Sequence, residues 1–320
     1  NVIDLTAFPV ERVNKTFRSN RRIGLGIMGF ADMLYQLHIP YNSKEGFATA
    51  EKVMGCIQEA SHKMSQELSE EKAVFPNWDM SIFKELGVKM RNAALTNIAP
   101  TGTTSMILDV SSGVEPYFAL AYTKKNILGG SQLYYLNKHL RQELEKYNLY
   151  NEEIMKRIYN EGTLTNIAEI PEEMKRVFVT AMDISAEDHI RMQAAFQNNI
   201  DNSISKTCNF PEDATKEDVL KCYLLAWSLG CKGCTVYRNN SRQHQVLELN
   251  KDKKSTITKA VEEAKVMVMQ TTSGETEMAL HKKLPSNPKL MEFCPECDSK
   301  VEVKEGCITC VSCGFSLCSI

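Results

Sequence analysis

Six cysteines crowd the end of the chain, in the stretch CPECDSKVEVKEGCITCVSCGFSLCSI that starts at residue 294. Four of them form two C-x-x-C pairs that are twelve residues apart: Cys294, Cys297, Cys310 and Cys313. Four thiolates in two such pairs are the ligand set of a closed tetrahedral zinc site. The spacing therefore predicts a structural zinc ribbon and leaves Cys307 and Cys318 without a zinc role.

A second stretch, NIAPTGTTSMIL at residues 97–108, joins an apolar strand-like piece to a loop of small and hydroxyl-bearing residues. The loop residues are Pro100, Thr101, Gly102, Thr103, Thr104 and Ser105. Unpaired backbone N–H groups at a helix start can hold a phosphate, since the helix dipole also favours anions there. No Gly-Lys follows, so this is no Walker A loop. On spacing alone, a phosphate site and an ordinary capped turn are equally consistent with these residues.

Glycines at positions 24, 26 and 29 spell GLGIMG, which matches the dinucleotide-binding fingerprint. That fingerprint needs an apolar strand just before it, and VNKTFRSNRR stands there instead. Close backbone packing is the favoured explanation, and an NAD-dependent dehydrogenase stays a minor alternative.

Two other features carry weaker signals. Glu115, within SSGVEPYF, is a candidate pocket-lining residue, although a solvated turn glutamate explains it as well. The CKGC pair at 231–234 follows a helix and Gly230, at the electronegative helix end that disfavours a thiolate. Structural cysteines are therefore expected there.

Composition limits the function classes. The chain has 38 basic and 40 acidic residues and a net charge of -2, which argues against a nucleic-acid surface. Its apolar runs are shorter than the roughly 20 residues of a membrane span, and its start does not resemble a signal peptide. We expect a cytoplasmic protein without membrane or nucleic-acid partners. Because the chain opens on Asn1 in mid-pattern, we also expect it to be part of a longer protein.

The periodicity predicts three regions. Residues 1–240 form a body in which helices alternate with short strands, as in an α/β domain. Residues 241–291 are polar and read as a flexible linker, and residues 292–320 are the cysteine-rich tail. The helices expected in the body span 43–72, 131–147, 151–161, 171–182, 185–199 and 215–230, and the strands 95–99, 203–209 and 235–237.

Several motifs in order carry a resemblance to one family: RRIGLGIMGFADML, NIAPTGTTSMI, SSGVEPYFALAYTKK, QAAFQNNIDNSISKTCNFP, SLGCKGCTVYR and the cysteine tail. They resemble the C-terminal part of adenosylcobalamin-dependent, class II ribonucleotide reductases. The resemblance implies the last part of a ten-stranded α/β barrel. It also implies reduction of ribonucleotides, with diphosphates expected, to 2′-deoxyribonucleotides by thiyl-radical chemistry that cobalamin initiates.

The resemblance implies roles for individual residues. The loop from Pro100 to Ser105 would bind the substrate phosphates. Val236 interrupts the tyrosine pair through which a radical-generating subunit would act, which favours cobalamin. Cys307 and Cys318 would shuttle electrons to the active site, while a competing assignment pairs Cys313 with Cys318 and gives Cys307 to zinc.

The resemblance also implies what lies elsewhere. The radical-cysteine motif Asn-Pro-Cys-Gly-Glu does not occur in this sequence, so an N-terminal part of the catalytic chain is an expected partner and the chain alone should be inactive. A thioredoxin or glutaredoxin reductant is expected, and a homodimer is one candidate assembly. The alternative function is that of a zinc-ribbon interaction protein without enzymatic activity.

Overall fold

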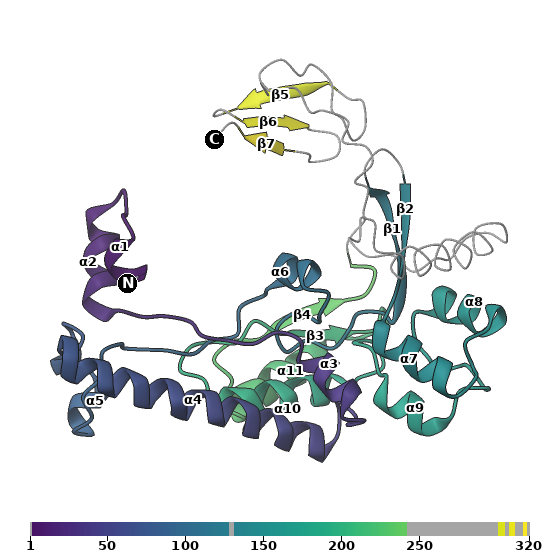
Figure 1. Ribbon diagram of the computed structural model, residues 1–320, viewed down its shortest axis with the longest axis horizontal. Helices are drawn as coiled ribbons and strands as arrows, with labels where there is room; N and C mark the ends of the chain where they lie inside the picture. The colour runs from purple at the N-terminus through teal and green to yellow at the C-terminus, as the bar shows by residue number, and fades with distance from the viewer. Residues whose placement is uncertain (1, 128–130, 242–299, 305–306, 311–315, 319–320) are drawn as a thin grey trace, which may run out of the picture. The chain divides into compact units, whose positions relative to one another are not determined.

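The computed structural model describes residues 2–127, 131–241, 300–304, 307–310 and 316–318 (Figure 1). The chain divides into two compact units. The first contains residues 1–120, 138–143 and 163–245, and the second contains residues 121–137, 144–162 and 246–320. The predicted linker, residues 241–291, lies outside the described residues except for Ser241.

Most helices belong to the first unit: α1 (Val2–Leu5), α2 (Glu11–Asn20), α3 (Phe30–Gln36), α4 (Lys44–Lys72), the 3-10 helix η1 (Trp78–Met80), α5 (Ile82–Glu85), α6 (Gly102–Ile107), α9 (Glu172–Val177), α10 (Ala186–Gln197) and α11 (Lys216–Ser228). Helix α8 (Glu152–Glu161) lies in the second unit, and α7 (Lys138–Lys146) begins in the first unit and ends in the second. Among the described helices, none has both the length and the apolar character that crossing a membrane requires.

Side-chain caps start the long helices where the sequence predicts. Ser43 accepts a hydrogen bond from the Gly46 amide at the start of α4. Ser185 caps α10 in the same way, and Thr215 forms a full capping box with Asp218 at α11. These caps satisfy amides that have no acceptor within the helix. The predicted boundaries of these three helices are therefore confirmed to within two or three residues.

Parallel strand segments form the centre of the first unit. Leu25 bridges Thr96, Ile98 bridges Ile204, and strand β3 (Thr207–Phe210) pairs with β4 (Thr235–Arg238), all in parallel. Each strand segment therefore pairs with the segment that comes before or after it in the sequence. Helices α4, α10 and α11 lie on one side of these segments in Figure 1. Parallel strands that pair in the order of the sequence, with the connecting helices on one face of the sheet, are typical of an α/β barrel.

Two glycines let the first two strand segments approach closely. A Cβ on Gly24 would lie 2.5 Å from Oδ1 of Asn97, and a Cβ on Gly26 would lie 2.2 Å from the Asn97 carbonyl oxygen. The contact at Gly26 is with backbone and leaves no room for a side chain, whereas the contact at Gly24 is with the end of the Asn97 side chain, which can move. GLGIMG is therefore a close-packing motif, and its context in the fold is not that of a dinucleotide fingerprint.

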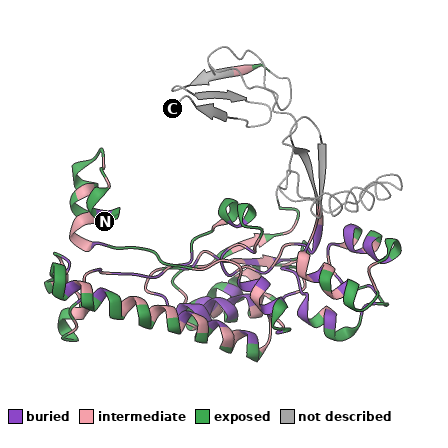
Figure 2. Cartoon of the chain, viewed as in Figure 1, coloured by how far each residue is buried: buried purple, intermediate pink, exposed green. Residues whose placement is uncertain are grey.

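The main hydrophobic core lies between the strands and helices α3, α4 and α10 (Figure 2). Phe30 of α3 packs edge-on against Phe196 of α10 with ring centroids 4.8 Å apart. Ile98 and Ile204 contribute from the two bridged strand segments. The core thus packs the strand segments against helices α3, α4 and α10. The loops that follow the strand segments start from this packed layer.

The described residues of the second unit form two antiparallel sheets. Strands β1 (Ala121–Ile127) and β2 (Ser131–Leu136) form a hairpin, in which the rings of Tyr122 and Tyr135 stack at 4.7 Å. The predicted helix 131–147 is therefore wrong in its first part, because aromatic residues favour a cross-strand pair there. The tail forms a three-stranded sheet of β5 (Val301–Lys304), β6 (Cys307–Cys310) and β7 (Ser316–Cys318).

One buried polar residue of the core is a histidine. His189 of α10 donates its Nε2 hydrogen to the Ala181 carbonyl (2.9 Å), and its Nδ1 accepts from the Lys206 ammonium (2.8 Å). Lysine has only donors, so this pairing fixes the neutral tautomer with hydrogen on Nε2. Burial and the neighbouring charge of Lys206 lower the pKa of His189 to about 3.

We expect Gly26→Ala to lower the free energy of unfolding by about 1–3 kcal/mol, because the new methyl group overlaps the Asn97 carbonyl. Urea denaturation followed by circular dichroism measures the change. Gly233→Ala is the matched control, since its Cβ would meet nothing within 4 Å. Equal stability of the two variants would contradict the close-packing explanation.

We expect His189 to make the chain less stable as the pH falls from 7 to 5. An unfolded histidine binds a proton near pH 6.5, whereas the folded one stays neutral down to about pH 3. The unfolded state therefore gains protons first, and stability declines by up to about 1.4 kcal/mol per pH unit in this window. The difference in slope between the wild-type chain and His189→Gln isolates this contribution, and equal slopes would refute it.

Candidate functional site

The predicted phosphate loop follows the strand segment that contains Ile98 and leads into helix α6. Thr101 has a left-handed backbone (φ 50°) and precedes the first helical residue, Gly102. The Ser105 amide closes the first turn on the Thr101 carbonyl at 2.8 Å. The amides of Gly102, Thr103 and Thr104 therefore stand at the helix start without an acceptor within the helix. These three amides belong to exposed residues, and anion binding requires donors that the anion can reach.

A neighbouring turn, Ser111–Glu115, holds this loop, and we call it the strap. The Gly113 amide donates to Oγ1 of Thr101 at 2.8 Å, and the hydroxyls of Ser112 and Ser105 lie 2.7 Å apart. Gly113 itself has φ +48°, and a Cβ there would press on Ile98 and the Ala99 carbonyl. The strap thus fixes both ends of the first turn of α6.

The strap is anchored to helix α3 through a buried aspartate. Asp32 accepts from the Ser111 amide and from the Tyr117 hydroxyl, both at 2.7 Å. The Ser111 carbonyl in turn accepts from the Gly29 amide at 2.8 Å. Gly29 lies at the start of α3 with φ +78°, so the third glycine of GLGIMG has a positive-φ capping role. Hydrogen bonds therefore hold the N-terminal end of the strap to the start of α3.

Glu115 anchors the other end of the strap to β3. Its Oε1 accepts from the Thr207 amide at 2.6 Å, and its Oε2 lies 3.3 Å from the Lys206 ammonium. Glu115 does not line the cavity described next, and its carboxylate is held by protein groups. Sequence reasoning missed Lys206, because nothing local marks a lysine whose partner is 91 positions away.

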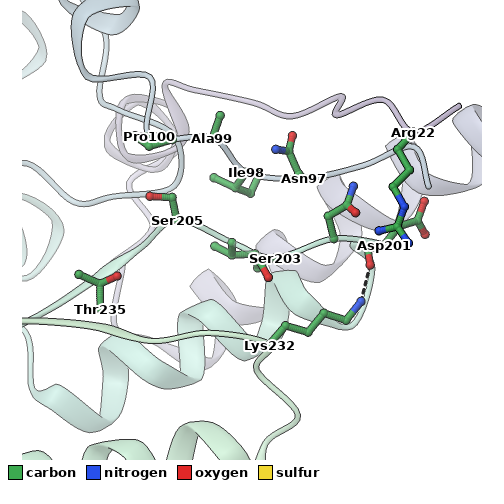
Figure 3. A pocket seen from close by; sticks show the side chains of 12 residues that line it. Arg22, Asn97, Ile98, Ala99, Pro100, Asp201, Ser203, Ser205, Lys232 and Thr235 are labelled. Carbon is green, nitrogen blue, oxygen red and sulfur yellow. Dashed lines mark hydrogen bonds between the residues drawn. The ribbon is translucent and has the colours of Figure 1, made fainter. Parts of the chain in front are cut away.

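A cavity of about 760 Å³ runs along the strand segments and reaches the phosphate loop at Pro100 (Figure 3). Its polar side chains come from strand ends and from the turn before β4. The lining residues are Arg22, Asn97, Ile98, Ala99, Pro100, Asp201, Asn202, Ser203, Ile204, Ser205, Lys232 and Thr235. This volume lies in the range of small-molecule sites.

Fixed charges shape one end of this cavity. The Lys232 ammonium donates to the Asp201 carbonyl, as the dashed line in Figure 3 marks. The Asp201 carboxylate turns to His62 (3.0 Å) and to the Leu95 amide (2.8 Å). Burial acts to raise the pKa of Asp201, but the hydrogen bonds from His62 and Leu95 outweigh it and the pKa lies below its usual value. This end of the cavity thus holds two cationic side chains, Arg22 and Lys232, beside the Asp201 carboxylate.

Three cysteines of the body, Cys208, Cys222 and Cys234, lie close together in the core. Sγ of Cys222 is 3.4 Å from Sγ of Cys208 and 3.9 Å from Sγ of Cys234. Hydrogen bonding with Cys208 raises the pKa of Cys222 to about 12, and burial raises that of Cys231 to about 11. In the described part of the chain, no cluster of histidine, cysteine and acidic side chains has the arrangement of a metal site.

Part of the predicted tail site lies outside the described residues. This holds for Cys294, Cys297 and Cys313, so the zinc site remains a prediction. The backbone register places Cys307 of β6 directly opposite Cys318 of β7. Opposite residues of an antiparallel pair have Cα atoms about 4.5–5.5 Å apart, within the range that a disulfide spans.

Comparison with known proteins identifies the body. Residues 1–89 and 81–237 match the barrel domain of ribonucleotide reductases. A vitamin B12-dependent ribonucleoside-diphosphate reductase of Thermoplasma acidophilum is 48% identical over 247 residues, which are 77% of this chain and 32% of that protein. The enzyme of the same name from Mycobacterium tuberculosis is 39% identical, over 77% of this chain and 35% of that protein.

The fold comparison agrees. The α subunit of the Actinobacillus ureae class Id ribonucleotide reductase superposes with a TM-score of 0.63 at 29% identity, over 74% of this chain and 43% of that one. The chain spans about a third of the length of the two curated relatives above. Since the barrel-domain match covers most of the body, the chain belongs to the ribonucleotide reductase family.

Proposed function

We propose that the chain supplies the substrate-phosphate loop and the disulfide-reducing tail of a cobalamin-dependent ribonucleoside-diphosphate reductase. The observation that carries the proposal is the loop from Pro100 to Ser105, whose exposed helix start presents three amides in a geometry that the strap fixes. The two relatives quoted above bear the names of vitamin B12-dependent ribonucleoside-diphosphate reductases.

In this proposal the loop binds the phosphates and the cavity receives the rest of the nucleotide. Backbone amides suit a diphosphate because they donate without needing a counter-charge of their own, and the helix start adds positive potential. The cavity begins at Pro100, so a nucleotide bound by the loop would extend along the strand ends. Binding in this pose orients the ribose and shields it from water.

The cofactor would carry the radical step. Adenosylcobalamin, when bound, supplies the radical that starts ribose chemistry, and we assign it no contact in this chain. Strand β4 agrees with a cobalamin enzyme: Val236 separates Thr235 from Tyr237, so the strand holds no adjacent tyrosine pair for a relay. The radical cysteine would come from sequence that this chain does not contain.

The tail would return electrons after each turnover. A disulfide formed in the substrate pocket needs a mobile dithiol to reduce it by exchange. Cys307 and Cys318 are the proposed dithiol, and their opposite positions in β6 and β7 support the pairing. Thioredoxin or glutaredoxin would then reduce the tail, zinc would stabilise it, and the reaction would take place in the cytoplasm.

We expect Thr104→Glu to weaken binding of CDP to the chain by at least about tenfold, because the new carboxylate occupies the anion site. The same charge favours the helix start, so folding stability should hold or rise. Titration calorimetry with CDP and with cytidine measures the phosphate contribution.

Thr104→Gln is the matched control, since it adds the same bulk without the charge. If Thr104→Glu and Thr104→Gln bind CDP equally well, the loop is not the phosphate site.

We expect Cys307→Ser and Cys318→Ser, made in the complete reductase, each to lower thioredoxin-driven turnover by about 100-fold and to spare turnover driven by dithiothreitol. A small thiol reaches the pocket without the tail. The zinc content of Cys313→Ser distinguishes the competing assignment: loss of zinc places Cys313 in the metal site, whereas retained zinc with lost turnover pairs it with Cys318. Full thioredoxin-driven activity of both Cys307→Ser and Cys318→Ser would rule out the proposed shuttle.

A further inference from the structure

Lys206 is a buried cation whose donors are all used. Its side chain is only 1% exposed. The ammonium donates to Glu115 (3.3 Å), His189 (2.8 Å) and the Thr207 carbonyl (3.0 Å), and it lies over the ring of Tyr41. Three donors meet three acceptors, which is the full capacity of a lysine. Burying a charge in this way costs more than an apolar side chain would, so packing alone does not explain Lys206.

Glu115 connects this cation to the strap. Its carboxylate bridges the Lys206 ammonium and the Thr207 amide, while its own amide donates to the Ser112 carbonyl at 2.9 Å. The neighbouring Val114 carbonyl accepts from the buried Tyr41 hydroxyl at 2.6 Å. The C-terminal half of the strap is therefore tied to β3 and to the core by charge and by hydrogen bonds.

The N-terminal half of the phosphate loop needs such support. Thr101 has a left-handed backbone (φ 50°), which is strained for a residue other than glycine. The Gly113 amide binds the Thr101 hydroxyl, and the Ser112 hydroxyl meets Ser105. A strained conformation persists only where its surroundings fix it. The contacts form a continuous path from the buried cation through the strap to the first turn of α6.

We propose that Lys206 and Glu115 are positioning residues for the phosphate loop: the ion pair between the buried Lys206 and the partly exposed Glu115 fixes the strap, and the strap sets the geometry in which the loop amides meet a nucleoside diphosphate. This role rests on the proposed function, because it concerns the same site. Neither residue touches the phosphates in it. The pair acts on affinity by preorganising the donors.

The test compares Lys206→Met and Glu115→Gln with the wild-type chain. We expect both variants to bind CDP about tenfold more weakly, since a charged hydrogen bond that orders the strap is lost. We expect faster hydrogen exchange at the Gly113 and Ser105 amides, which report the loop contacts directly. The Met33 amide of α3 should keep its exchange rate.

Leu164→Ala is the control for a merely structural effect, because it removes a buried side chain and destabilises the fold without a hydrogen bond to the strap. Its CDP affinity should equal that of the wild-type chain under folding conditions. Unchanged affinity and unchanged Gly113 exchange in both ion-pair variants would overturn the positioning role alone. No CDP binding by the wild-type chain would overturn the proposed phosphate site, and the positioning role with it.

Discussion

An irregular turn that lies inside the protein must find a partner for every backbone polar group, and this constraint governs the strap. Ser111 and Val114 are buried, so water cannot satisfy the groups around them. The partners of these two residues are Asp32 and Tyr41, which lie 79 and 73 positions away from them in the sequence, and Gly113 between them binds Thr101 of the phosphate loop. Satisfying the turn therefore forces helix α3, the core and the candidate site into one arrangement.

Close approach of the strand segments is the second condition for this arrangement. Because Gly24 and Gly26 carry no side chain, the strand segment around Leu25 lies close to Asn97. The segment that contains Asn97 then leads directly to Pro100 of the phosphate loop. With helices α4, α10 and α11 on one side, the strand segments leave polar side chains such as Asn97 and Ser205 to line a cavity. The same arrangement of strands and helices thus forms both a core and a cavity.

Local signals in the sequence were sufficient where the determining contacts are local. The caps at Ser185 and Thr215 act over three residues, and both helices begin within one residue of the starts that the sequence predicts. Tyr135 lies in a strand because its partner is Tyr122 on the other arm of a hairpin, which periodicity cannot reveal. The sequence does not reveal the role of Lys206 either, because its partner Glu115 is 91 positions away. The composition of residues 100–105 predicts the phosphate loop, but the strap that fixes this loop depends on contacts between residues distant in the sequence.

The thiol chemistry of the body places the proposed redox work elsewhere. Exchange needs a thiolate, and a thiol with a pKa near 11 or 12 supplies almost none at neutral pH. Burial and mutual hydrogen bonds keep Cys222 and Cys231 in that range, so these cysteines act as small apolar core residues. In the proposed enzyme we therefore assign the electron transfer to the tail cysteines and not to Cys222 or Cys231. Cys307 and Cys318 meet the backbone requirement for a reversible disulfide, since their strands place them opposite each other.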